Sequence, residues 1–359
     1  MNLPRTARLH APIIGLVVVA LLAALWAALG RIGWRMPQLP MPILGQHGAL
    51  MTSGFLGTLV SLERSVALQK RWTYAVPFLS ALGSLALVIG LPFEIGRTLL
   101  VLGALGLVIV FWHIYRLHST IDIVTMAIGA SMWFIGNTLW LFNQPLYYAS
   151  PWWAGFLILT IAGERLELSR VLLLNKTSRD VFKVALGTFS IGLLVSLIVP
   201  DIGVRIAGAG LLLFGVWLLR YDVARRTIRK NGLTRFIAAC LLPGYVWLVI
   251  GGGLWMAIGL SSTAGFLYDA MLHALFLGFV FSMIFGHAPI IIPAVMPIDV
   301  EYRPRFYVHL ILLQLSLVVR VVADLLAAQP LRQWAGLFNV LAVLIFLGNM
   351  IRSMRRRTA

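Results

Sequence analysis

The chain has 359 residues, of which 60% are hydrophobic and only 11% are charged, whereas roughly 25% of the residues of a soluble domain are charged. This composition excludes a soluble globular protein, a disordered chain and a fibrous protein. The formal net charge is +17, and in so apolar a chain an excess of Lys and Arg is typical of cytoplasmic loops between membrane helices. The single cysteine, Cys240, excludes an intrachain disulfide and a cysteine-based metal cluster.

Apolar runs long enough to cross a bilayer predict an all-α, polytopic bundle of about twelve transmembrane helices, which we expect to form a single integral membrane domain over residues 1–359. The first run resembles a secretory signal, but its length and the weak cleavage site at Ala28-Leu29-Gly30 predict a retained helix. The runs lie near residues 11–30, 47–68, 74–92, 98–118, 121–142, 147–168, 182–199, 203–220, 236–260, 266–288, 306–328 and 334–351.

The basic residues predict the orientation of these helices. With the amino terminus placed in the cytoplasm, 23 of the 29 Lys and Arg residues fall in cytoplasmic segments, as the positive-inside rule requires. We therefore expect both termini in the cytoplasm and a multi-pass protein of a bacterial-type inner membrane. The basic loop near 220–235 is interpreted as a topogenic loop and not as a nucleic-acid site. The basic residues expected outside are Arg31, Arg35, Arg97, Arg205 and Arg332.

The second predicted helix begins at His47, and Met51 follows one turn later. Gly48, Gly54 and Gly57 leave one side of this helix without side chains. One interpretation is close packing against a neighbouring helix. The other is a flat macrocycle that lies against the bare side with the His47 imidazole as its axial ligand, because histidine commonly ligates haem iron. These residues alone leave both interpretations open.

The tenth predicted helix carries two histidines, His273 and His287, fourteen residues apart. At this spacing the imidazoles share one helix face to within about 40° and are separated by about 21 Å of helical rise. Asp269 precedes His273 by one turn and is placed to accept a hydrogen bond from its second ring nitrogen, as carboxylates do for ligating histidines. Two histidines on one stripe, one of them beside a carboxylate, favour metal ligation.

The eleventh predicted helix carries a polar stripe on an apolar background. His309, Ser316, Arg320 and Asp324 recur along it at intervals of seven, four and four residues. Arg320 either pairs with Asp324 within the helix or binds an anionic group such as a haem propionate, because a guanidinium binds a carboxylate through two parallel hydrogen bonds.

Helical rise sorts four of the histidines into two layers. His47 and His273 lie in an outer layer, and His287 and His309 lie in an inner layer. Two imidazoles that ligate one iron must lie at matching depth on opposite sides of it, so His47 and His273 are the predicted axial pair. The inner pair is a candidate for a second metal. Whether the helices that carry these residues are neighbours does not follow from the sequence.

Three segments resemble the NnrS family of twelve-span membrane proteins. They are the run QHGALMTSGFLG in the second predicted helix, the HAL-x-x-G-F run with a later GHAP in the tenth, and the arginine-containing eleventh. The resemblance implies haem and copper as cofactors and a link to nitric oxide resistance. That family typically has a His-x-His pattern in the second helix, whereas Gly45 and Ala49 flank His47 here, which leaves fewer ligands for copper.

The pattern His-Gly-x-x-Met at residues 47–51 is also similar to the helix-two haem-ligand motif of haem–copper oxidases. Their six-histidine arrangement and tyrosine cross-link region have no counterpart in this sequence, so a terminal oxidase is not expected.

The leading hypothesis is therefore a haem-binding membrane protein that handles nitric oxide or a related small ligand. Met51 and Gly54 are then expected beside the cofactor, Asp269 orients His273, and Arg320 holds a propionate. Besides haem and such a gas, the expected partner is the lipid bilayer, while the electron donor and the oligomeric state do not follow from the sequence.

Two alternatives use the same polar residues differently. The first is a cofactor-free proton-coupled or small-solute transporter that uses Arg320, Asp324 and Asp269. Such transporters often contain repeated halves, and no similarity between the two halves is evident in this sequence. The second alternative is an assembly or scaffold subunit whose polar stripes are contact surfaces.

Overall fold

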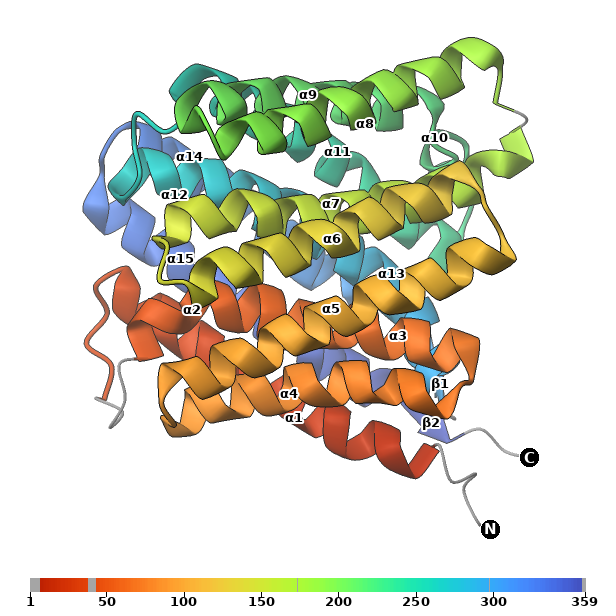
Figure 1. The fold of residues 1–359 in the computed structure, drawn as a ribbon, viewed down its shortest axis with the longest axis horizontal. Helices are drawn as coiled ribbons and strands as arrows, with labels where there is room; N and C mark the ends of the chain where they lie inside the picture. The colour runs from red at the N-terminus through yellow and green to blue at the C-terminus, as the bar shows by residue number, and fades with distance from the viewer. Residues whose placement is uncertain (1–6, 38–42, 173, 297, 357–359) are drawn as a thin grey trace. The chain divides into compact units, whose positions relative to one another are not determined.

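The computed structural model describes residues 7–37, 43–172, 174–296 and 298–356, which are almost entirely helical (Figure 1). Its long helices are α1 (Ala7–Arg31), α3 (Thr58–Leu68), α4 (Ala75–Ile89), α5 (Phe93–Leu117), α6 (Ile121–Leu141), α7 (Leu146–Leu168), α8 (Lys176–Ser196), α9 (Pro200–Tyr221), α11 (Gly232–Ile258), α12 (Gly265–His273), α13 (Ser282–Val295), α14 (Phe306–Leu325) and α15 (Gln329–Ser353). The short helices are α2 (His47–Ala49) and α10 (Ala224–Thr227), with 3₁₀ turns at Ile43–Gln46, Arg71–Tyr74 and Ser169–Leu172 and π-helical segments at Leu50–Gly57 and Ala274–Phe281.

Helices or runs of consecutive helical segments occupy all of the predicted apolar ranges. Nine helices within the described parts of the chain are long and apolar enough to cross a membrane. The prediction of an all-α, multi-pass membrane protein is thereby confirmed. A small departure from it is the pair of short strands β1 (Ile298–Val300) and β2 (Met354–Arg356), which form a two-stranded sheet near the carboxyl end.

The chain folds as two compact units that are interleaved in sequence. The first consists of Met1–Thr160, Ile291–Asp299 and Arg356–Ala359, and the second of Ile161–Ile290 and Val300–Arg355. The chain therefore passes from the first unit to the second within α7 and returns within α13.

A buried polar network joins four segments of the first unit. The Asn137 side-chain oxygen on α6 accepts hydrogen bonds from Ser53 Oγ at 2.8 Å and from Trp153 Nε1 on α7 at 2.9 Å, and its amide nitrogen donates to the carbonyl of Leu100 on α5. Trp133 Nε1 in turn donates to Ser53 Oγ at 2.9 Å. Asn137 is therefore an interhelical hydrogen-bonding residue, as expected for an asparagine inside a membrane helix.

In the first unit, helix α1 forms a side-chain contact with the carboxyl end of α13. His10 on α1 is buried, and its Nδ1 lies 2.9 Å from the carbonyl oxygen of Val295 at the end of α13. Its other ring nitrogen lies 3.2 Å from the Tyr74 hydroxyl. His10 therefore connects segments that lie 285 positions apart in the sequence.

In the second unit, α9 packs between α8 and α11. Arg205 on α9 donates to the carbonyls of Met256, Ala257 and Ile258, which end α11 without intrahelical partners. Asp201 holds the Arg205 guanidinium at 2.8 Å and accepts from the backbone N–H of Leu260 just beyond the helix. Arg205, counted in the sequence only as an outer basic residue, is thus a C-terminal cap of a membrane helix.

Candidate functional site

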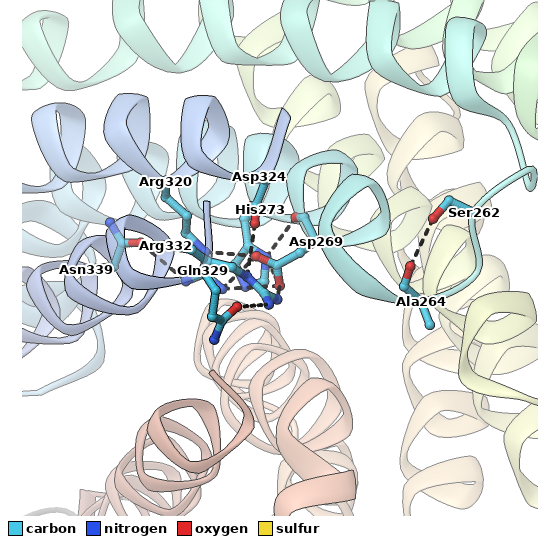
Figure 2. A network of polar contacts seen from close by, with 9 residues as sticks. All are labelled: Ser262, Ala264, Asp269, His273, Arg320, Asp324, Gln329, Arg332 and Asn339. Carbon is cyan, nitrogen blue, oxygen red and sulfur yellow. Dashed lines mark hydrogen bonds and ion pairs between the residues drawn. The ribbon is translucent and has the colours of Figure 1, made fainter. Parts of the chain in front are cut away.

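A cluster of four charged side chains lies where α12, α14 and α15 of the second unit meet (Figure 2). Its members are Asp269 on α12, Arg320 and Asp324 on α14, and Arg332 on α15, and we call it the ion-pair cluster. The side chains of Arg320 and Asp324 are only 6% and 0% exposed. Two carboxylates and two guanidiniums make the cluster neutral overall, which lowers the cost of burying charge in a membrane protein.

Arg320 is bound to Asp269 through both carboxylate oxygens. Its Nε donates to Oδ2 at 3.0 Å and its second terminal nitrogen donates to Oδ1 at 3.2 Å. The remaining terminal nitrogen donates to Asn339 Oδ1 at 3.3 Å, and the Asn339 amide donates to Ser316 Oγ at 2.7 Å. Because each guanidinium nitrogen already has a protein partner, Arg320 does not fit the predicted role of holding a haem propionate.

Arg332 joins the two carboxylates of the ion-pair cluster. Its guanidinium lies 3.2 Å from Asp269 Oδ1 and 2.9 Å from Asp324 Oδ1, the second contact without hydrogen-bonding geometry. It also lies over the Phe266 ring, 5.0 Å from the ring centroid. The alternative that Arg320 pairs with Asp324 within the helix is wrong for the described residues, since Arg320 pairs with Asp269 and Asp324 pairs with Arg332.

His273 lies on the ion-pair cluster in the manner expected from its spacing to Asp269. Its Nδ1 is 2.9 Å from the backbone carbonyl oxygen of Asp269 and 3.3 Å from the carboxylate oxygen Oδ1. Two acceptors at this atom place the proton on Nδ1 and make Nε2 the basic ring nitrogen. This is the tautomer in which metal-ligating histidines are held by a carboxylate or a carbonyl.

His47 has a similar setting in the first unit. Its Nδ1 lies 2.9 Å from the carbonyl oxygen of Ala24 on α1, so its Nε2 is also the basic nitrogen. Met51 lies one turn further along, and both side chains are half-buried, while the residues from Thr52 to Thr58 are buried. The prediction that His47 and His273 ligate one iron stays a prediction.

The bare side of the second predicted helix is covered by protein. A Cβ at Gly54 would lie 2.7 Å from Ser84 Oγ on α4, and a Cβ at Gly57 would overlap the Trp133 ring on α6. Of the two interpretations, helix packing therefore accounts for Gly54 and Gly57, whereas a Cβ at Gly48 would only reach ordinary contact with Trp153, at 3.9 Å. The assignment of Gly54 to a cofactor-binding surface is corrected accordingly, because Ser84 and Ala20 occupy the space beside its Cα.

A backbone feature that the sequence did not predict follows both outer histidines. The π-helical segment Leu50–Gly57 begins three residues after His47, and the π-helical segment Ala274–Phe281 begins directly after His273. Both segments are eight residues long, whereas π-helix is rare and is found frequently at functional sites. The backbone thus sets apart the same two histidines that were predicted as an axial pair.

The two inner histidines have different surroundings. His287 lies with Nδ1 2.7 Å from the Met283 carbonyl oxygen and Nε2 3.4 Å from the Arg165 guanidinium. A neighbouring cation opposes metal binding at that nitrogen. Arg165 is itself bound to Asp222 through two hydrogen bonds of 2.8 Å.

His309 is fully buried against aromatic rings, with ring centroids of Phe285, Phe346, Phe236 and Phe306 within 4.7–5.9 Å. Its Nδ1 lies 3.1 Å from the Asn349 amide nitrogen. Within the part of the chain that the structure describes, no three His, Cys, Asp or Glu side chains come together in a way that could hold a metal ion. The donor set at His287 and His309 therefore does not fit the predicted second metal.

Sequence reasoning missed Arg332 and the Arg165–Asp222 pair. It counted both arginines as loop charges that set the orientation of the helices. A signal for Asp222 was present, since it is the only acidic residue in the basic stretch 220–235. The signal for Arg332 was its position eight residues after Asp324 across a very short connection between two apolar helices.

The helices and the buried ion-pair cluster define a class, the polytopic helical membrane proteins with a charged network inside the helical bundle. Within that class, the chain belongs to the family described as a domain of unknown function (DUF8744), which matches residues 8–355. No curated protein matches the chain.

Proposed function

We propose that the protein is a haem-binding membrane protein with twelve spans, both termini in the cytoplasm, and a place in a bacterial-type inner membrane. The helical segments at all twelve predicted ranges support the number of spans. The concentration of Lys and Arg in alternate connecting segments supports the orientation.

One observation carries the haem proposal. The Nδ1 atom of His273 lies close to two oxygens of Asp269, the backbone carbonyl oxygen at 2.9 Å and the carboxylate oxygen Oδ1 at 3.3 Å. A ring fixed in this way keeps one orientation, as metal-ligating histidines do when a carboxylate or carbonyl holds their other ring nitrogen. His47, held at Nδ1 by the Ala24 carbonyl, is the proposed second ligand. The π-helical segments next to both histidines support the choice of this pair over the other five histidines.

The residues of the ion-pair cluster have a supporting role in this proposal. Arg320 and Arg332 both contact the Asp269 carboxylate and fix its position beside the Nδ1 atom of His273. Haem iron would bind nitric oxide or a related small ligand, the class of ligand that the NnrS resemblance implies, only in a form in which one of the two histidines does not ligate it. Copper is not part of the proposal, because the described residues bring together no donor set that fits it.

The test is an absorption spectrum of the purified full-length protein, expressed with added haem precursor, together with a pyridine haemochrome assay. The wild-type protein is expected to show a Soret band, and H273A is expected to lose it. Asp269→Asn is expected to keep haem but shift the band and lower the affinity about 10- to 100-fold, as for other partners of ligating histidines.

His118→Ala is the matched control, because His118 is exposed at the end of α5 and is expected to leave the spectrum unchanged. His47→Ala tests the role of His47 as the second ligand separately from haem ligation by His273. Loss of a six-coordinate spectrum in this variant supports the pair, and an unchanged spectrum assigns the second position to another group. A colourless wild-type protein contradicts haem binding altogether.

A second function, proton-coupled or small-solute transport, is favoured by the ion-pair cluster itself. Asp324 is completely buried, and neither of its carboxylate oxygens has a hydrogen bond from the described residues. A buried carboxylate of this kind inside a membrane domain is a common element of proton pathways.

Proton flux into liposomes that contain haem-free protein distinguishes the two functions. If the protein is a transporter, Asp324→Asn abolishes the flux. Asp180→Asn is the control, because Asp180 lies in an exposed pair with Lys183 on α8. Flux that is equal in wild-type protein and D324N excludes a transport role for this cluster.

A further inference from the structure

Four arginines surround a pocket at the end of α9, in the second unit. Arg220, Arg225, Arg226 and Arg229 line this pocket, which has a volume of about 520 Å³ and which we call the arginine pocket. Among the described residues, none of these guanidiniums forms an ion pair. Arg225 is positioned by a 2.9 Å hydrogen bond to the Arg220 carbonyl.

The lining of the arginine pocket includes one carboxylate, Asp222, and this group is already bound. Its two oxygens accept hydrogen bonds from Arg165 at 2.8 Å, and one of them also accepts from the Ala224 backbone at 2.7 Å. The Asp222 side chain is 0% exposed. The positive charge of the four arginines therefore remains available to an anion.

A second cavity of about 910 Å³ begins at the same arginines. Arg225 and Arg229 line it at one end, and the rest of its lining is almost entirely apolar and comes mainly from α11 and α14. We call it the apolar groove. Its side chains Val246 and Val318 are 46% and 50% exposed. Trp247 also faces it, with the indole N–H engaged by Gln314 at 2.8 Å.

The dimensions of the apolar groove suit a hydrocarbon chain. Leu242 and Ile250 both line it, and eight residues of α-helix between them correspond to about 12 Å. Because the lining over this length is apolar, it offers a polar ligand no hydrogen-bond partner. A ligand that fills both cavities must therefore carry a negative charge at one end and an apolar chain at the other.

We infer that this surface binds an anionic glycerophospholipid. The phosphate lies between Arg225 and Arg229, where guanidiniums form two parallel hydrogen bonds to phosphate oxygens, and one acyl chain lies in the apolar groove. Basic pockets between membrane helices are known to take such head groups. Arg225 and Arg229 line both cavities and so connect them. This continuity favours a lipid, because a free anion would occupy the arginine pocket but leave the apolar groove empty.

Native mass spectrometry of the detergent-purified full chain tests the site, with phosphatidylglycerol and phosphatidylcholine as probes. Phosphatidylglycerol is expected to bind in preference to the zwitterionic lipid. Each arginine near a lipid phosphate contributes roughly a fivefold change in affinity, so Arg225→Gln with Arg229→Gln is expected to weaken binding about 30-fold. Lys230→Gln is the matched control, because it removes one charge from the same loop outside both cavities.

Two further measurements separate a lipid from a free anion. Val246→Trp fills the apolar groove and is expected to weaken phosphatidylglycerol binding while leaving the arginines in place. Inorganic phosphate and glycerol phosphate, added at millimolar concentration, are expected to displace little of the bound lipid. The inference is overturned by equal binding of both lipids, by an R225Q/R229Q double variant that binds normally, or by inorganic phosphate that binds as well as lipid.

Discussion

At the scale of single residues, the ion-pair cluster shows how four charges are kept inside a membrane domain. Asp269 receives two guanidiniums, Arg332 contacts both carboxylates, and His273 lies on the remaining side of Asp269. Removing one member leaves a buried charge without its partner, which is more destabilising than removing an entire pair. The contacts are therefore expected to be strongly interdependent.

A double-mutant cycle on Asp269 and Arg320 tests this interdependence. Asp269→Asn and Arg320→Gln are each expected to destabilise the folded protein by about 3–5 kcal/mol. The double variant is expected to lose less than the sum of the two, with an interaction energy of about 1–3 kcal/mol. Equilibrium unfolding in mixed micelles measures all four proteins.

Lys183→Gln is the control for this cycle. Lys183 and Asp180 form a 3.7 Å pair on the exposed surface of α8, and such pairs contribute about 0–1 kcal/mol. Strictly additive effects of the Asp269 and Arg320 substitutions contradict a cooperative cluster.

The residues of this cluster were only partly predictable from the sequence. Periodicity placed Asp269 one turn before His273 and put Arg320 on a polar stripe, because those relations hold within one helix. The Arg320–Asp269 pair joins two helices. Its geometry depends on how those helices pack, and periodicity within one helix gives no information on that packing. Arg332 was missed for a related reason: it lies in the first turn of α15, and a short connection brings it back to Asp324.

At the scale of elements, hydrophobic runs predicted where the membrane helices lie, because a helix that crosses a bilayer must be apolar over its full length. The same runs contain no sign of the π-helical segments at Leu50–Gly57 and Ala274–Phe281. One extra residue per turn changes which side chains share a face without changing the apolar composition. The faces assigned to Met51 and Gly54 assumed α-helical spacing, which does not hold within Leu50–Gly57.

Gly57 is expected to be required for packing of the first π-helical segment. A Cβ there overlaps Trp133, so Gly57→Ala is expected to destabilise the protein by about 1–3 kcal/mol. Gly15→Ala on α1 is the control, because no atom outside that helix lies within 4 Å of the added Cβ and the substitution favours the helix by about 0.5–1 kcal/mol. Thermal unfolding compares the two, and equal melting temperatures contradict a packing role for Gly57.

The connection before α14 gives a pH dependence outside the membrane helices. A 2.7 Å hydrogen bond from Arg303, with a smaller contribution from Arg355, holds the pKa of Glu301 below its usual value. A carboxyl group with a lowered pKa stabilises the folded state above its ordinary pKa, and this contribution is lost as the pH falls through the lowered value.

Glu301→Gln is therefore expected to lower the melting temperature at neutral pH and to have a smaller effect in acid. Arg303→Gln is expected to remove most of the same pH dependence. A melting-temperature difference between wild type and E301Q that grows as the pH falls contradicts this assignment.

At the scale of the whole molecule, the proposed orientation is open to chemical labelling. The single natural cysteine, Cys240, is fully buried, so it contributes little background. Lys230→Cys and Thr263→Cys place exposed thiols on the connections before and after α11. With both termini in the cytoplasm, a membrane-impermeant maleimide is expected to label Thr263→Cys in intact spheroplasts and Lys230→Cys only after permeabilisation. The opposite pattern reverses the topology.

The contact between His10 and Val295 has a consequence for biogenesis. The first helix is inserted at the start of synthesis, but the carbonyl that receives its histidine is made 285 residues later, which at about 5–20 residues per second is a delay of roughly 15–60 s. Tyr74, the other partner of His10, is made only 64 residues after it. A nascent chain arrested between these two points therefore has a His10 that can contact Tyr74 but lacks the acceptor that α13 supplies.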